Sequence, residues 1–341
     1  MGDIVSDNEK LTRFEFRKLF QLYGASLLIT ACAPKIVQKI LTPISTPYIP
    51  STSTPNPPTN TPEPTHEPPT NTPEPTPSYT PRELERLQRI EKYGVATKIL
   101  SLEFHGDNYN MYDGAYTMNP NTFEWMMNWF KNNEVWSLNQ DELIGYLDGT
   151  MNMPARSVIL TTDSGNTSLE SLPRMIPVLQ YTGMHFISLI WTRNMLESET
   201  SKCKYDSCWK TFEDALKSGV YSFGTHTESH GDFSTFTLEK GLDDILQSKQ
   251  EIENRLGINV KVLSWPFEAC PVWGHELKNY GIEAAFGGNI RFIKENTVYP
   301  EDPARYCLPR LLPPNAGSRV SGRPNGMTLY EMMKTYTNGF D

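Results

Sequence analysis

The chain has 341 residues and a formal net charge of −9 at pH 7. This acidic balance excludes the basic footprint that nucleic-acid binding requires and fits poorly with a polyanionic substrate, which leaves neutral glycans as candidate partners. The length would allow about two globular domains, but residues 42–81 are dominated by Pro, Thr, Ser and Asn, so the chain is not globular throughout.

Residues 1–32 are typical of an export segment. Three basic residues precede an apolar run, 19–31, that is too short for an ordinary membrane span. The run ends in Leu-Ile-Thr-Ala-Cys, which resembles a bacterial lipoprotein lipobox and implies that Cys32 is lipidated after cleavage. The alternative is a buried amphipathic helix with an incidental cysteine. We predict export and a lipid anchor at the outer face of a bacterial cell membrane.

The next segment, residues 33–81, is predicted to be a disordered linker. It repeats TNTPEPT at 59–65 and at 70–76. Such a composition has too little apolar surface to offset the entropy of ordering, and its prolines favour extended polyproline II. From there the composition becomes globular, and residues 82–341 are predicted to form one catalytic domain.

Helical and strand-like patterns alternate along this domain. Helices are expected at 82–92, 121–132, 141–147, 169–182, 212–218, 238–256 and 275–280. Strands are expected at 95–104, 157–162, 185–190, 220–223, 260–265, 284–287 and 308–312. The alternation predicts an α/β fold of parallel β–α units that closes into a barrel or forms an open sheet. In such folds the chemistry lies at the carboxyl ends of the strands.

Polar side chains follow three of these strands. Asp163, His105 and the H-x-x-x-H pair of His226 and His230 each stand just after a strand-like run. Two histidines at this spacing can lie on one face of a helical turn and reach one metal ion, beside which a carboxylate could act as a base. The pattern predicts a metal-dependent hydrolase. The structural alternatives are a loop histidine pair, a helix-capping aspartate and a core histidine.

Four cysteines remain when Cys32 is set aside, and an even number in an exported domain favours disulfides. A Cys203–Cys208 bridge would close a short loop. A Cys270–Cys307 bridge would tie the segment after one strand to a later one. A four-cysteine zinc site is the alternative, but no C-x-x-C spacing occurs.

Together these motifs resemble the polysaccharide deacetylase (NodB homology) family over roughly residues 98–312. The sequence TTDSG at 161–165 is similar to the family's T-F-D-D-G motif, and HTESH at 226–230 is similar to H-[ST]-x-x-H with one extra residue. The sequence SWPF at 264–267 is similar to R-x-P-[YF]. Phe-His-Gly at 104–106 lies where a permuted branch, which includes poly-N-acetylglucosamine deacetylases, carries a Y-H-x pattern.

The resemblance implies a distorted (β/α) barrel that removes N-acetyl groups from N-acetylhexosamine units of a cell-wall or extracellular polysaccharide. It implies that His226 and His230 hold a divalent metal, with zinc expected first and Ni, Co, Mn or Fe as alternatives. Asp163 would then be the general base for the metal-bound water, and His105 the general acid for the leaving amine.

Substrate contact is assigned to Trp265, Pro266 and Phe267, because aromatic faces near a glycan cleft can stack on sugar rings. The next residue, Glu268, stands where glycine is common in the family, so it is expected to reshape the floor of the pocket.

Two departures from the family pattern bear on activity. Ser164 replaces the aspartate that is the third metal ligand, and a serine hydroxyl is a poor ligand for zinc. Ser164 itself, Glu228, Asp107 or water would have to complete the site. Ser264 replaces the arginine that partners the catalytic aspartate, so this partner is expected to be absent. The second hypothesis is therefore a deacetylase-like domain that binds glycan without turnover.

Overall fold

The structure, a computed structural model, describes residues 79–105, 119–195, 205–287, 297–314 and 327–340. Contacts divide the chain into two units, Met1–Pro73 and Glu74–Asp341, and every described residue belongs to the second. The predicted lipidation site Cys32, nearly all of the predicted linker, Asp107 and Cys203 lie outside the described residues. Within the described ranges, no helix has the length and apolar character that crossing a membrane requires.

The second unit is built on a curled parallel sheet with the strand order β1-β3-β4-β5-β6-β7 and with β2 (Trp136–Ser137) paired to β3. The main strands are β1 (Leu100–His105), β3 (Ser157–Ser164), β4 (Phe186–Ile190), β5 (Tyr221–Thr225), β6 (Val262–Ser264) and β7 (Ala284–Phe286). Each strand pairs in parallel with its neighbour. The α/β prediction is confirmed.

A short segment, residues 308–311, joins the two edges of this sheet, and we call it the closing segment. Leu308 pairs with Phe286 of β7, and Leu311 pairs with Leu102 of β1, both in parallel. The predicted strand at 308–312 is therefore split into two bridges, because its two ends pair with different strands. The closure confirms the expected distorted (β/α) barrel.

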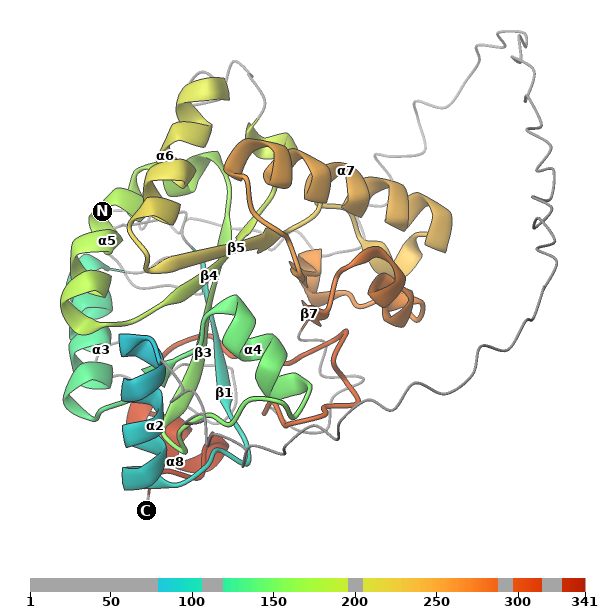
Figure 1. Ribbon diagram of the computed structural model, residues 1–341. Helices are drawn as coiled ribbons and strands as arrows, with labels where there is room; N and C mark the ends of the chain where they lie inside the picture. Colours follow the sequence, from blue (N-terminus) through green and yellow to red (C-terminus); the bar gives the residue numbers. More distant parts are fainter. Residues whose placement is uncertain (1–78, 106–118, 196–204, 288–296, 315–326, 341) are drawn as a thin grey trace, which may run out of the picture. The chain divides into compact units, whose positions relative to one another are not determined.

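Helices surround the sheet (Figure 1). They are α2 (Pro81–Tyr93), α3 (Pro120–Asn132), α4 (Gln140–Leu147), α5 (Ser171–Thr182), α6 (Tyr205–Lys217), α7 (Leu238–Leu256) and α8 (Leu329–Tyr336). Around the sheet, α3 packs on α5, α5 on α6 and α6 on α7. Thr80, Asn139 and Thr237 begin three of the helices by accepting hydrogen bonds from backbone N–H groups of the first turn. Helix α8, which the sequence patterns did not predict, packs against β1.

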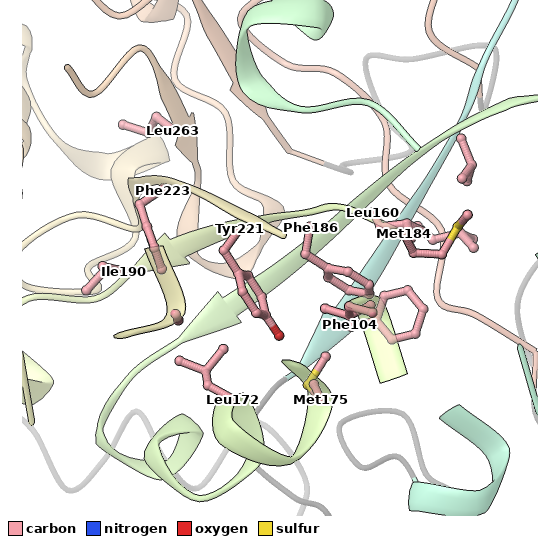
Figure 2. Packing of buried hydrophobic residues seen from close by; sticks show 14 of the residues in the cluster. Phe104, Leu160, Leu172, Met175, Met184, Phe186, Ile190, Tyr221, Phe223 and Leu263 are labelled. Atoms are coloured by element: carbon pink, nitrogen blue, oxygen red, sulfur yellow. The ribbon is translucent and has the colours of Figure 1, made fainter. Parts of the chain in front are cut away.

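Buried aromatic side chains hold the strands against the helices (Figure 2). The ring centroids of Phe104 on β1 and Phe186 on β4 lie 5.1 Å apart, and Tyr221 on β5 lies 6.2 Å from Phe186. Burial of each large apolar side chain contributes roughly 1.5–3 kcal/mol. Because side chains alternate along a strand, the residues between these core positions, such as Glu103 and His105, face the opposite side of the sheet.

Candidate active site

Polar side chains from four strands and the closing segment meet at the carboxyl ends of the strands. His105 and Asp163 are direct neighbours across the pairing of β1 with β3. His226 follows the end of β5, and Ser264 ends β6. Arg310 enters from the closing segment. Parallel strands end at one edge of a sheet, which is why residues so distant in the chain converge here.

Asp163 accepts three hydrogen bonds from two side chains of the site. Its Oδ1 accepts a hydrogen bond from Arg310 Nη1 at 2.7 Å, and its Oδ2 accepts one from Arg310 Nη2 at 3.0 Å. Ser264 Oγ donates to Oδ1 at 3.0 Å. Burial alone would raise the pKa of Asp163, but the Arg310 guanidinium and His226 outweigh it and hold this pKa well below its usual range. Asp163 is therefore an ionised carboxylate.

Arg310 also binds a second acid, Glu103 on β1. The Arg310 Nη2 atom lies 2.7 Å from Glu103 Oε1, and the Arg310 side chain is 1% exposed. Burial raises the pKa of Glu103 to about 8 against the pull of Arg310, and the neighbouring Asp163 and Glu268 raise it further. One guanidinium thus balances one of two buried carboxyls, and Glu103 keeps its proton at neutral pH.

His226 is fixed in one tautomer by Ser264. Its Nδ1 lies 3.0 Å from the Ser264 carbonyl oxygen and 2.6 Å from Ser264 Oγ. Because the carbonyl oxygen can only accept, we assign the proton to Nδ1, which leaves the lone pair on Nε2. That Nε2 lies 3.7 Å from Asp163 Oδ2. Burial lowers the pKa of His226 to about 4 despite the attraction of Asp163, so the ring is neutral at pH 7.

His226 and His230 lie close together, with ring centroids 4.8 Å apart. The predicted helical turn between them is wrong. Thr227 (φ 71°) and His230 (φ 56°) both adopt left-handed backbone conformations. The turn is held by Thr225 Oγ1, which accepts from the Thr227 N–H at 2.9 Å, and by Thr227 Oγ1, which accepts from the His230 N–H at 3.1 Å. The two rings therefore meet through a tight turn after β5 instead of a helix face.

Aromatic rings flank His230 on two sides. Its ring centroid lies 4.5 Å from that of Trp191 and 4.8 Å from that of Phe267. Phe267 is 68% exposed, whereas Trp265 and Pro266 are buried in the protein. Of the three residues assigned to substrate contact, Phe267 is therefore the one that offers a ring face to solvent.

The two side chains proposed as third metal ligands both have partners elsewhere. Ser164 follows Asp163 on β3, so its side chain points to the other face, where Ser188 Oγ donates to its Oγ at 2.9 Å. The Glu228 carboxylate pairs with Arg193, whose Nε donates to Oε1 at 2.8 Å. The ligand roles of Ser164 and Glu228 stay predictions.

A different group has the compactness of a metal site. Among the described residues, the ligand atoms of Glu103, His105 and Asp163 all lie within 4.8 Å of one another. However, the Arg310 guanidinium already binds both carboxyls, and a second cation there would be repelled by it. His226 has the usual form of a histidine ligand, a neutral imidazole whose Nδ1 is hydrogen-bonded and whose Nε2 carries the lone pair. The metal-ligand roles of His226 and His230 stay predictions.

Arg310 and Glu103 are the site residues that sequence reasoning missed. The expected absence of an arginine partner for Asp163 is wrong, because Arg310 supplies that partner from a distant segment. Each residue is a charge inside an otherwise apolar, strand-like run, and an ionisable residue in a buried strand is seldom left unpaired. A charged residue within an apolar strand is therefore the sequence pattern that could have indicated both site residues.

The predicted Cys270–Cys307 disulfide is present, with a Cα–Cα distance of 5.9 Å. It anchors the residue just before the closing segment to the loop that follows Phe267 and Glu268. The predicted Cys203–Cys208 bridge cannot be placed, since Cys203 lies outside the described residues.

Residues 150–285 match the family model for polysaccharide deacetylase. The matched range includes Asp163, the histidine pair and Ser264, and it ends before the closing segment. No curated protein matches the sequence.

Solved structures share the fold. IcaB from Ammonifex degensii is 19% identical with a TM-score of 0.52, and the match covers 63% of this chain and 91% of that one. The Streptococcus pyogenes deacetylase PplD is 16% identical with a TM-score of 0.54, over 64% of this chain and 92% of that one. BC0361, a polysaccharide deacetylase from Bacillus cereus, is 18% identical with a TM-score of 0.51, over 64% and 65% of the two chains.

Proposed function

Because residues 150–285 match the polysaccharide deacetylase family model, we propose that the chain is a member of that family and a metal-dependent hydrolase acting on N-acetylhexosamine units of a cell-wall or extracellular polysaccharide. The observation that carries the proposal is the placement of Asp163. It is held ionised by Arg310 and Ser264, faces the free Nε2 of His226 at 3.7 Å, and is the cross-strand neighbour of His105.

These residues divide the proton transfers of amide hydrolysis between them. Asp163 accepts the proton of the water whose oxygen bonds to the acetyl carbonyl carbon. His105 donates a proton to the amide nitrogen as the C–N bond breaks, so acetate and a free amine leave. A divalent metal held by His226 and His230 would, when bound, acidify that water and polarise the carbonyl. Asp163 is a weak base because its pKa is low, so it suits a water that is already acidified.

A neutral amino sugar suits the surroundings of the site. The exposed ring of Phe267 beside His230 can pack against a sugar face. The net charge of −9 disfavours polyanions. PplD was solved in complex with acetate, the product expected here.

A second candidate is a domain that binds glycan without turnover. It is favoured by Ser164, which stands where the family pattern has a metal-binding aspartate and whose hydroxyl is bonded to Ser188. Loss of a carboxylate ligand weakens metal binding.

Metal content and acetate release measured on one preparation separate the two candidates. We expect the purified chain to hold a divalent metal and to release acetate from N-acetylglucosamine oligomers, and Asp163→Asn to lower the rate by about 100-fold or more. Retained glycan binding without metal or acetate would establish the non-catalytic candidate.

We also propose that the protein is exported and anchored through a lipid on Cys32. The support is the lipobox-like sequence before Cys32 and the proline-rich segment after it.

A further inference from the structure

Ser264 and Arg310 share one acceptor, an oxygen of the Asp163 carboxylate. Ser264 Oγ and Arg310 Nη1 both donate to Asp163 Oδ1, at 3.0 and 2.7 Å. Ser264 is fully buried, so a longer side chain at position 264 would crowd the groups that its Oγ contacts, including the Asp163 oxygen to which Arg310 donates. The serine at 264 and the arginine at 310 therefore belong to one arrangement: the short side chain makes room, and the arginine arrives from elsewhere.

The closing segment delivers this arginine to the barrel interior. Its two ends are fixed by the pairings of Leu308 and Leu311 with β7 and β1. Next to Arg310, the Leu311 carbonyl accepts a hydrogen bond from the Glu103 N–H at 2.9 Å. Arg310 and Glu103 are thus held together through the main chain as well as through their side chains.

Glu103 and Asp163 both contact the same nitrogen, Nη2, of the Arg310 guanidinium. Arg310 Nη2 lies 2.7 Å from Glu103 Oε1 and donates to Asp163 Oδ2 at 3.0 Å. Glu103 is in turn hydrogen-bonded to Glu268. A long, flexible side chain whose planar head contacts two carboxyls has little freedom to rotate, so the carboxylate bound to it is also fixed.

We propose that Arg310 and Glu103 act as a pair of positioning residues: Arg310 orients the carboxylate of Asp163, and Glu103 holds Arg310 in place. Together they orient the Asp163 carboxylate, the role that the family pattern gives to an arginine at position 264. This inference rests on the proposed function, because it concerns Asp163 as the base of that reaction.

Chemical rescue tests the role of Arg310. We expect Arg310→Ala to lower kcat by about 100-fold, with KM changed less than about threefold, since a displaced reacting group costs this much. Millimolar guanidinium, far below denaturing concentrations, should restore much of the kcat of Arg310→Ala. It should not restore Arg310→Met, whose side chain fills the cavity. Unchanged kcat in Arg310→Ala, or no rescue of it, would overturn the inference.

Further variants test the role of Glu103 and whether an arginine at position 264 can replace the arginine at position 310. Glu103→Gln keeps an oxygen that accepts from Arg310, so its kcat should stay within about threefold of wild type, whereas Glu103→Ala should lose about tenfold or more. The double variant Ser264→Arg/Arg310→Ala should recover kcat relative to Arg310→Ala. Equal activity of the two Glu103 variants, or no recovery in the double variant, would count against the pair.

A readout without turnover separates this inference from the proposed function. In a crystal structure of Arg310→Ala the Asp163 carboxylate should rotate away from Ser264, and in Ser264→Arg/Arg310→Ala it should again accept two hydrogen bonds from a guanidinium. An unmoved carboxylate in Arg310→Ala overturns the inference whether or not the wild-type protein releases acetate. Absence of acetate release from wild type, with the carboxylate displaced as expected, contradicts only the proposed function.

Discussion

At the scale of single residues, the site contains one buried cation, Arg310, and two buried acids, Asp163 and Glu103. Asp163 receives two hydrogen bonds from the Arg310 guanidinium and one from Ser264, so it carries the negative charge. Glu103 receives fewer donors in an equally buried place, and burial raises its pKa to about 8. The base is thus ionised while its neighbour stays neutral, which avoids two uncompensated charges in the interior.

This difference predicts how stability depends on pH. The Glu103 carboxyl ionises near pH 4.5 in the unfolded chain and near pH 8 in the folded protein. Its contribution to the free energy of unfolding is therefore complete below pH 4.5 and is lost as the pH rises towards 8, by at most about 1.4 kcal/mol per pH unit. Denaturant unfolding from pH 5 to 8 should show a flatter decline for Glu103→Gln than for wild type. Parallel curves for the two proteins would refute the assignment.

Strained backbone conformations occur in the loops that carry the candidate active site. Of the described non-glycine residues with positive φ, four lie in the two loops that carry the site: Thr227, His230, Phe267 and Glu268. Each such conformation costs on the order of 1 kcal/mol or more, and it persists where the surroundings impose it. Here the strained turns bring the ring of His230 beside His226 and turn Phe267 outward.

At the scale of elements, the closing segment joins the barrel edges and also supplies a site residue. Its pairings complete the sheet between β7 and β1, and Arg310 lies between those pairings. The Cys270–Cys307 disulfide holds its start. The stability of this element and the orientation of Asp163 should therefore change together.

Removal of that disulfide tests the coupling. We expect Cys270→Ser/Cys307→Ser to lower the free energy of unfolding by about 2–4 kcal/mol and to lower kcat as well, because Arg310 is held less firmly. A suitable control is Arg156→Ala, which loses hydrogen bonds to the Gly339 and Asn133 carbonyls far from the site. The control should lose stability with unchanged kcat. A disulfide variant that keeps full kcat would show that the segment acts independently of the bridge.

At the scale of the whole molecule, the sequence joins a predicted export segment and a proline-rich linker to the barrel unit. A lipid on Cys32 would hold the domain at a membrane while the linker sets its reach. We expect the wild-type protein, produced in a bacterial host, to incorporate labelled fatty acid and to sediment with membranes. Cys32→Ala should lose both properties and keep the acetate-releasing activity of the domain. Membrane association of Cys32→Ala without label would rule out the lipid anchor.

The sequence by itself determined the α/β class, most of the helices and strands, and the strand ends that carry Asp163, His105 and the histidine pair. These follow from local periodicity and from the rule that parallel strands end at a common edge. The Cys270–Cys307 pairing was also predictable, since few cysteines were available to pair.

Only the tertiary structure decided which side chains complete the site. Arg310 binds Asp163 across a sequence separation of 147 residues, a contact that no local pattern encodes. The turn between His226 and His230 depends on threonine side chains that bond the backbone, and helical spacing alone misread it. Burial likewise separated Trp265 in the core from Phe267 at the surface, because adjacent residues take their environment from what packs against them.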